Sequence, residues 1–439
     1  MSKSKSIGFV SLGCPKAASD AEQILTRLRA EGYEISGSYD GADLVVVNTC
    51  GFIDAAVEES LDAVGEALAE NGKVIVTGCL GAKRDAAGND VVRSAHPKVL
   101  AVTGPHALQE VMEAVHLHLP PLHDPFVDLV PPQGIRLTPD HYAYLKIAEG
   151  CDRPCSFCAI PLMRGKNVSQ PIEDLITETQ KLAAHGVKEL ILIAQDLTYY
   201  GIDLYGERKL ADLLRALAQI EGIEWIRLHY AYPTGFPLDV LEVMKTEPKI
   251  CNYIDIPLQH INTDILKSMR RGHNREQLEK LLSDFRTSVP DIAIRTTLIV
   301  GYPGETRAQF EELKQWVADS RFDRLGVFAY SHEDDTHAAS LTDDISDEEK
   351  QSRVAEIMEL QAGISFELNQ EKVGKVFKCI FDREEGGYYI GRTQYDSPDV
   401  DNEVLVASDQ HFINLGHFIE VKITEASDFD LVGEVVEGD

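Results

Sequence analysis

The sequence lacks any apolar run long enough to cross a membrane, which takes about 18 consecutive apolar residues. It also lacks the long apolar segment of a secretory signal, because residues 2–6 alternate serine with lysine and lead straight into a short apolar run. These absences predict a cytoplasmic protein. The eight cysteines of the 439-residue chain are then better explained by metal or redox work than by disulfides.

Basic side chains are also scarce, with 42 Lys and Arg against 72 Asp and Glu and a formal net charge of −30. Affinity for nucleic acid comes largely from Lys and Arg on phosphates, so this balance disfavours a nucleic-acid partner and favours a basic protein. The remaining composition, 44% hydrophobic and 26% charged, is ordinary for a globular protein with a sizeable core. The length predicts about two to four domains.

Three cysteines lie close together in the middle of the chain, just after a predicted strand: Cys151, Cys155 and Cys158, here called the loop triad. Soft thiolate ligands select iron-sulfur clusters or zinc, and three of them can hold three irons of a cubane cluster. The fourth iron is then open to a small molecule. Structural zinc takes four ligands, and no fourth Cys or His follows at finger spacing. The loop therefore favours a reactive cluster, with zinc or unligated buried thiols as alternatives.

Three further cysteines, Cys14, Cys50 and Cys79, each end a short apolar run and are here called the edge triad. The runs cover residues 7–13, 43–49 and 74–78, and helical patterns cover 20–31 and 55–70. This β-α-β-α order predicts a parallel sheet with doubly buried strands, whose carboxyl ends meet at one edge. The edge triad is expected to gather there as a second three-thiolate site. The alternative is that each residue is an ordinary buried cysteine.

A stretch with six prolines, residues 119–139, predicts an extended linker. Beyond it, six strand patterns alternate with helical patterns, which predicts an incomplete parallel barrel with its active site at the carboxyl ends of the strands. The first connecting helix is expected to have Ser169 as its N-cap, Pro171 in its first turn and Gly186 at its end. The six strand patterns cover 141–147, 188–194, 224–229, 252–258, 292–300 and 324–330.

Residues 371–439 change to alternating, β-branched patterns that predict a small five-stranded barrel, at 375–383, 388–393, 403–407, 417–424 and 431–436. Such barrels often bind nucleic acid, but this segment has 16 acidic residues against 6 Lys and Arg. It is therefore expected to dock a basic protein, with a merely solvated face as the alternative. The carboxylates expected to dock it share one predicted loop: Asp396, Asp399, Asp401 and Glu403.

These features together resemble the radical S-adenosylmethionine methylthiotransferases over essentially the whole chain. Within that family the chain is most similar to the enzymes that modify an aspartate of small-subunit ribosomal protein S-twelve. The segments that carry the resemblance are Ser11–Lys16, Asn48–Ile53, Val76–Leu80 and Tyr144–Cys151. Relatives that modify tRNA adenosine usually have Gln-Met-Asn where this chain has Pro15-Lys16-Ala17. Two departures are Ala17, where asparagine is usual, and residues 19–22, where Val-Asp-Ser-Glu is usual.

The resemblance implies an α/β multidomain enzyme. Its parts would be a methylthiotransferase domain with a parallel α/β sheet at 1–118, the linker at 119–139, a TIM-like (β/α)6 radical core at 140–370, and an OB-like five-stranded TRAM domain at 371–439. The resemblance also implies two protein partners, the basic ribosomal protein and a reductant protein. It implies no association with a membrane.

The resemblance further implies two four-iron clusters and S-adenosylmethionine. The loop triad would hold the cluster that reduces S-adenosylmethionine to methionine and a 5′-deoxyadenosyl radical. The edge triad would hold an auxiliary cluster that carries the sulfur to be methylated and transferred. An aspartate β-carbon has an unactivated C–H bond that no side-chain base can deprotonate, so a radical made by the cofactor is needed.

Contacts to S-adenosylmethionine are expected from Phe157, Gln195, Gly301 and Gly304, which lie in the loop or at strand ends. The alternatives are ordinary packing for the phenylalanine and simple chain turns for the glycines. Side chains expected to point into the same mouth are Arg295, Gln259 and His260.

Two other functions remain open on the sequence. A tRNA adenosine methylthiotransferase would share both clusters, and the acidic last domain is the feature against it. A non-catalytic iron-sulfur carrier would also need cysteine ligands but has no use for a six-unit barrel. The remaining cysteines, Cys251 and Cys379, are lone thiols expected to be structural.

Overall fold

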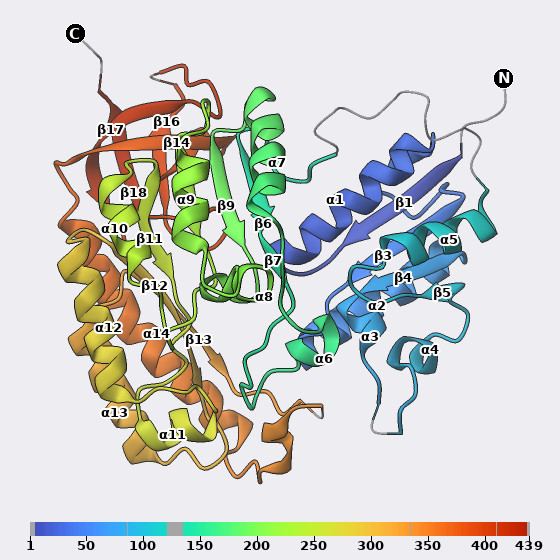
Figure 1. The fold of residues 1–439 in the computed structure, drawn as a ribbon, viewed down its shortest axis with the longest axis horizontal. Helices are drawn as coiled ribbons and strands as arrows, with labels where there is room; N and C mark the ends of the chain where they lie inside the picture. The colour runs from blue at the N-terminus through green and yellow to red at the C-terminus, as the bar shows by residue number, and fades with distance from the viewer. Residues whose placement is uncertain (1–4, 86, 121–134, 334, 410, 437–439) are drawn as a thin grey trace.

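The computed structural model describes residues 5–85, 87–120, 135–333, 335–409 and 411–436. An N-terminal α/β domain lies beside a central open barrel, and a small closed barrel covers one end of the central one (Figure 1). The predicted linker falls largely on 121–134, outside the described residues, so it stays a prediction. No helix in the described part of the chain is long and apolar enough to span a bilayer.

The N-terminal domain is the predicted parallel sheet, with strand order β2-β1-β3-β4-β5. Its central strands are wholly buried because α1 and α5 pack on one face of the sheet and α2 on the other. Helix α1 begins five residues earlier than predicted, since Pro15 suits a first helical turn. The strands are β1 Ser6–Ser11, β2 Glu34–Ser36, β3 Leu44–Thr49, β4 Val74–Gly78 and β5 Ala101–Val102. The helices are α1 Pro15–Ala30, α2 Asp54–Glu70, α3 Cys79–Ala82, α4 Val91–Ala95 and α5 Leu108–His118.

The central domain is an open sheet of six parallel strands in the order β13-β12-β11-β10-β9-β6, which confirms the incomplete barrel. Its strands are β6 Tyr142–Lys146, β9 Glu189–Ile193, β10 Trp225–Leu228, β11 Ile250–Asp255, β12 Ala293–Val300 and β13 Arg324–Ala329. The longer helices are α7 Ile172–Ala184, α9 Leu210–Ala218, α10 Asp239–Thr246, α12 Arg275–Ser288, α13 Arg307–Ser320 and α14 Asp347–Gln370. Shorter elements are β7 Ala148–Glu149, β8 Val168–Ser169, α6 Ile160–Arg164, η1 Leu197–Tyr199, α8 Ile202–Tyr205, α11 Thr263–Ser268 and η2 His337–Ser340.

Two local predictions in this domain are wrong. Ser169 does not cap α7, because it belongs to the short ribbon of β7 and β8, and its hydroxyl donates to Asp203 at 2.6 Å. Pro171 was predicted in the first turn but directly precedes α7 as its N-cap residue, whereas Gly186 follows the end of the helix, as predicted, with a φ of +93°.

The C-terminal domain is the predicted five-stranded barrel, closed in the order β14-β15-β16-β18-β17. Its strands are β14 Val376–Glu385, β15 Tyr388–Thr393, β16 Glu403–Ala407, β17 Phe418–Ala426 and β18 Asp430–Val435. It packs against the amino ends of the central strands, where Ile380 joins an apolar cluster with Trp225 and Tyr253. This domain therefore lies at the end of the central barrel opposite the loop triad (Figure 1).

The acidic loop of this small barrel is not the exposed docking face that its charge predicted. Asp396 is fully buried and pairs with Arg324, and the buried side chain of Asp401 lies 3.3 Å from Arg295. A charge count cannot reveal this, because both arginines come from central strands far away in the sequence. The other two predicted docking residues differ from these: Glu403 pairs with Arg383 at 2.8 Å, and Asp399 is exposed.

A buried network of charged side chains links the two barrels. We expect that breaking it lowers the stability of the protein strongly. Glu189 is fully buried between Arg227 and Arg392, and Arg392 also donates to Asp382 at 2.9 Å. Arg392→Met leaves buried carboxylates short of a partner, so we expect it to lower the free energy of unfolding by about 3–5 kcal/mol in urea titrations. As a matched control on the same barrel, the half-exposed Arg383→Met should cost less than about 1 kcal/mol. Equal effects would contradict this interpretation.

Candidate functional site

The loop triad follows β6 and β7, at the carboxyl end of the first barrel strand. Gly150 makes the turn into the loop with a φ of +78°, and a Cβ there would lie 2.1 Å from the carbonyl oxygen of Lys166. The loop is pinned from both sides, since the Cys151 N–H donates to Gly165 at 3.0 Å and the Ser156 N–H to Met269 at 3.0 Å. The three thiols are thereby presented on a fixed backbone.

Hydrogen-bond donors face two sulfurs of the loop triad. The buried guanidinium of Arg271 donates to Cys155 Sγ at 3.2 Å, and the backbone N–H of Arg153 donates to Cys151 Sγ at 3.4 Å. Both guanidinium groups lie over the Tyr232 ring, at 4.3 Å for Arg271 and 4.1 Å for Arg153. Such donors stabilise sulfur that carries negative charge, as in a thiolate bound to iron.

The edge triad gathers at one edge of the N-terminal sheet. Cys14 precedes α1, Cys50 follows β3 and Cys79 begins α3, so all three lie at the carboxyl ends of neighbouring strands. Their loops approach closely: a Cβ on Gly13 would lie 3.2 Å from that of Cys50, and one on Gly51 would lie 3.1 Å from the carbonyl carbon of Cys79. Glycine is therefore required at both positions for the three loops to meet.

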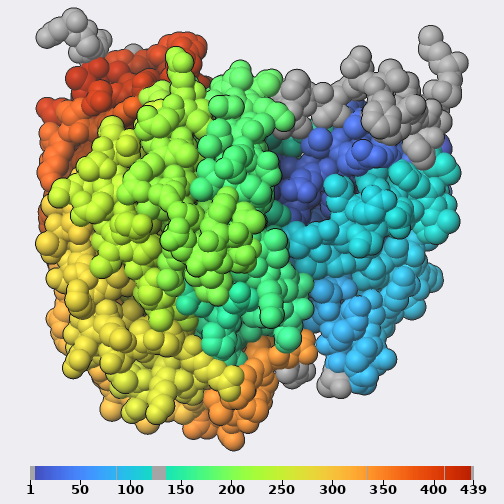
Figure 2. Space-filling model, viewed as in Figure 1, coloured from blue at the N-terminus to red at the C-terminus, as the bar shows by residue number. Residues whose placement is uncertain are grey.

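One arginine joins this edge to the central barrel. Arg164, at the end of α6, is buried and donates to Cys79 Sγ at 3.3 Å. It also contacts Asp20 at 3.3 Å and Glu149 at 3.1 Å. A residue six positions beyond the loop triad thus reaches a sulfur of the edge triad across the domain interface. The two domains lie in direct contact along this interface (Figure 2).

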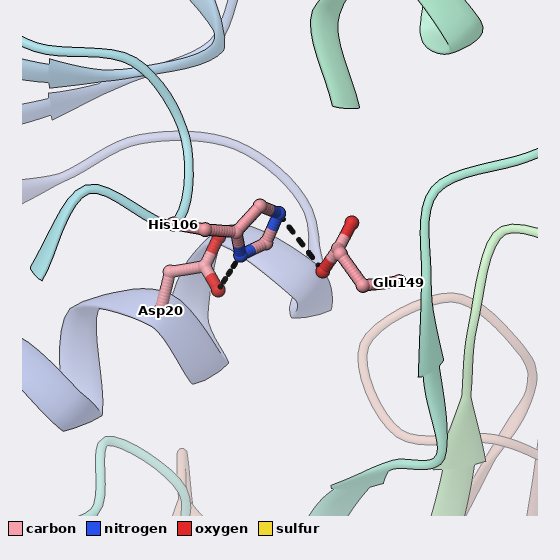
Figure 3. Close-up of side chains that lie close together, drawn as sticks. All are labelled: Asp20, His106 and Glu149. Atoms are coloured by element: carbon pink, nitrogen blue, oxygen red, sulfur yellow. Dashed lines mark ion pairs between the residues drawn. The ribbon is translucent and has the colours of Figure 1, made fainter. Parts of the chain in front are cut away.

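A second interdomain contact adjoins it, where His106 lies between Asp20 and Glu149 (Figure 3). The distances are 3.3 Å from Nδ1 to Asp20 and 2.9 Å from Nε2 to Glu149. Burial would raise the pKa of Glu149, but His106, Lys146 and Arg164 hold it well below its usual range. Because Lys146 and Arg164 already pair with these carboxylates, we assign this group to interdomain packing and not to a metal.

Both triads fit iron-sulfur clusters better than single zinc ions. Each triad supplies three thiol ligands, one fewer than the four that a structural zinc ion takes. Burial raises the pKa of Cys151 to about 11 and that of Cys158 to about 12, so a bound cation is what would ionise these thiols. Three soft donors per site leave one iron of a cubane cluster open.

The predicted S-adenosylmethionine contacts lie around the loop triad. Gln195, beyond the end of β9, donates to Glu149 at 2.6 Å, and its Oε1 is buried without a hydrogen-bond partner. Gly301 and Gly304 follow β12 in a turn with positive φ, and Tyr302 between them bonds to Ser156 of the loop at 2.9 Å. The fold thus brings these positions to one end of the barrel, and an unpartnered amide oxygen there is available to a ligand.

The remaining residues that the sequence predicted for this site lie in several different environments. Phe157 packs in an apolar cluster with Met269 and Tyr302, which agrees with the alternative of ordinary packing. His260 is fully buried, with its Nε2 3.1 Å from Glu305. Arg295 is tied to Asp255 and Asp401, while Gln259 has a buried, unpartnered Oε1 and a φ of +72°.

Sequence reasoning missed the arginines that contact sulfur. Arg164 lies within six residues of Cys158, and this short spacing was a usable signal. Arg271 lies more than a hundred residues from Cys155, so nothing local in the sequence marks it. Lone thiols Cys251 and Cys379 are both buried away from the triads, in the packing of the two barrels.

Family models match three segments of the chain. Residues 6–104 match the Uncharacterized protein family UPF0004, residues 145–317 match the Radical SAM superfamily, and residues 373–436 match the TRAM domain. These segments correspond to the three parts of the fold (Figure 1).

Curated relatives match over almost the full length. A protein of Flavobacterium johnsoniae named ribosomal protein uS12 methylthiotransferase RimO is 55% identical, over 98% of this chain and 98% of its own. The chain belongs to the RimO family of radical SAM methylthiotransferases. Proteins of the same name from Cytophaga hutchinsonii and Ralstonia nicotianae are 52% and 51% identical, covering 98% and 99% of both chains. As a member of this family the chain is an enzyme that uses an iron-sulfur cluster and S-adenosylmethionine.

Solved structures support the fold alone. The radical S-adenosylmethionine methyltransferase TsrM from Kitasatospora setae, with cobalamin and a [4Fe-4S] cluster bound, superposes with a TM-score of 0.56 at 14% identity. The match covers 88% of this chain and 81% of that one. It agrees with an N-terminal α/β domain set beside a radical SAM barrel.

Proposed function

We propose that this enzyme methylthiolates the β-carbon of an aspartate residue in ribosomal protein uS12, the S-twelve protein of the small subunit. The proposal is supported by two three-thiol sites, with Arg164 just after the loop triad donating to Cys79 of the edge triad, in a chain whose relatives are named uS12 methylthiotransferases. The reaction replaces one β C–H bond with a C–SCH3 bond. A C–H bond of this kind requires radical chemistry, which the family's cofactors supply.

The loop triad would hold one four-iron cluster and the edge triad an auxiliary one. With both clusters and S-adenosylmethionine bound, the cofactors would supply a radical at the first site and a methylated sulfur at the second. The protein residues position these groups: the Arg271 side chain and the backbone N–H of Arg153 donate to sulfurs of the loop triad, and the Arg164 side chain donates to Cys79. Gln195, Gly301 and Gly304 would contact S-adenosylmethionine, and Phe157 would pack beside its adenine.

The interdomain contacts have a role in this scheme. Transfer of the methylated sulfur from the auxiliary site to a radical on the substrate carbon requires that the two sites keep a fixed separation. Arg164 and Lys146 bridge the two domains through Asp20, His106 bridges them through Glu149, and these contacts can hold that separation. Close packing around the sites would also exclude water from reactive intermediates.

The proposed setting is the cytoplasm, with a basic uS12 as substrate and a reductant protein as electron source. Direct binding of nucleic acid is disfavoured by the net charge of −30. The second candidate is a tRNA adenosine methylthiotransferase, which would use the same two clusters. No observation on the described residues favours it over the protein substrate.

The test uses anaerobically reconstituted enzyme with a uS12 peptide deuterated at the β-carbon of the target aspartate, and tRNA in a parallel reaction. We expect a methylthiolated peptide, and deuterium in the 5′-deoxyadenosine, because the radical removes a hydrogen from that carbon. Deuterium that stays entirely in the peptide would contradict attack at the β-carbon. Methylthiolated tRNA with an unchanged peptide would establish the second candidate instead.

A further inference from the structure

A lysine stands between the two triads. Lys16 is the second residue of α1, two positions after Cys14, and its ammonium lies 4.0 Å from the centroid of the Tyr230 ring in the central barrel. Tyr230 lies just beyond the carboxyl end of β10, at the same end of the barrel as the loop triad. One cation from the N-terminal domain therefore reaches the end of the barrel where the loop triad lies.

The neighbouring cations are already paired. Arg164 and Lys146 both contact Asp20, and Arg153 pairs with the carboxylate of Asp196 at the end of β9. The Lys16 ammonium differs, because no carboxylate of the described chain lies within 4.0 Å of it. It remains able to bind an anionic group that arrives with a ligand.

Tyr230 is held in a conformation that tyrosine rarely adopts. Its φ is +62°, in the left-handed region, just beyond the end of β10. Two hydrogen bonds fix it there, from its own N–H to Asp255 at 3.0 Å and from the Leu197 N–H to its carbonyl at 3.1 Å. The ring packs on an inward-facing cluster of β6 and β9 and lies beneath Lys16. Strain that the surroundings maintain at a strand end points to a functional role.

We propose that Lys16 binds the side-chain carboxylate of the target aspartate, with the Tyr230 ring holding the ammonium in place. The inference rests on the proposed function, which supplies a substrate carboxylate. An ammonium beside an aromatic face is partly desolvated, so its pairing with a carboxylate is stronger than in open water. Because the β-carbon is bonded directly to the carboxylate carbon, this pairing would place the reacting carbon between the two triads. Lys16 is thus a specificity-determining residue.

The test measures binding of fluorescent uS12 peptides to the reconstituted enzyme by anisotropy, with aspartate or asparagine at the target position. Wild-type enzyme should bind the aspartate peptide about tenfold or more tightly than the asparagine peptide, as one charged contact implies. Lys16→Met should remove this preference, and Lys16→Arg should restore part of it. The matched control is Lys73→Met, an exposed lysine of the same domain that precedes β4.

Cleavage of S-adenosylmethionine without peptide and the absorbance of both clusters should be unchanged in Lys16→Met. A Lys16→Met enzyme that keeps the aspartate preference would overturn the inference, and so would one that loses peptide-independent cleavage, since Lys16 would then serve the cofactor. Failure of the proposed function is distinguishable, because wild-type enzyme would then leave the aspartate peptide unmodified.

Discussion

Loss of methylthiolated product together with survival of S-adenosylmethionine cleavage is the expected result of replacing Cys14, Cys50 and Cys79 by alanine. The loop triad lies in a different domain from these residues and keeps its own backbone supports, from Gly165 and Met269. The radical should therefore still form, while the sulfur to be transferred has no site. Product would be measured by mass spectrometry of the peptide and cleavage by chromatography of 5′-deoxyadenosine.

The matched control replaces the two lone cysteines, Cys251 and Cys379, which are buried outside both triads. This variant should keep both activities, although the lost packing will lower its stability. If the edge-triad variant folded normally yet lost all cleavage of S-adenosylmethionine, the assignment of separate sites would be wrong.

The second large expected effect is a loss of iron from the loop-triad variant. Reconstituted wild-type enzyme should carry about eight irons, as two four-iron clusters require. Replacing Cys151, Cys155 and Cys158 by alanine should remove about half of the iron and all formation of 5′-deoxyadenosine, and the remaining cluster should stay visible by electron paramagnetic resonance after reduction. Iron content by colorimetric assay checks the first expectation.

Two outcomes would contradict this interpretation. Complete loss of iron from a folded loop-triad variant would mean that the edge triad holds no cluster of its own. Stoichiometric zinc in place of iron in the wild-type enzyme would mean that the triads are zinc sites and not cluster sites.

Much of the fold was predictable because each domain has a clear local pattern. Buried runs such as Val74–Gly78 read as parallel strands on their own, and five alternating segments after residue 370 read as a small barrel. The edge triad was predictable for a geometric reason, since parallel strands bring their carboxyl ends to one edge whatever lies between them.

The failures with the largest consequences involve contacts between distant segments. The acidic loop looked exposed because its partners, Arg324 and Arg295, lie in strands some seventy to a hundred residues earlier. Arg271 at Cys155 and Tyr230 at Lys16 depend likewise on how the domains pack. The charge and periodicity of a segment indicate how it meets solvent. They do not show which buried partner another domain provides.

Modification of uS12 and not of tRNA by this enzyme is tested most directly by mass spectrometry of both molecules from a strain that lacks the gene. We expect uS12 to be lighter by one methylthio group, less the hydrogen that replaces it, and methylthiolated tRNA nucleosides to be unchanged. Unaltered uS12 together with missing methylthio groups on tRNA would contradict it.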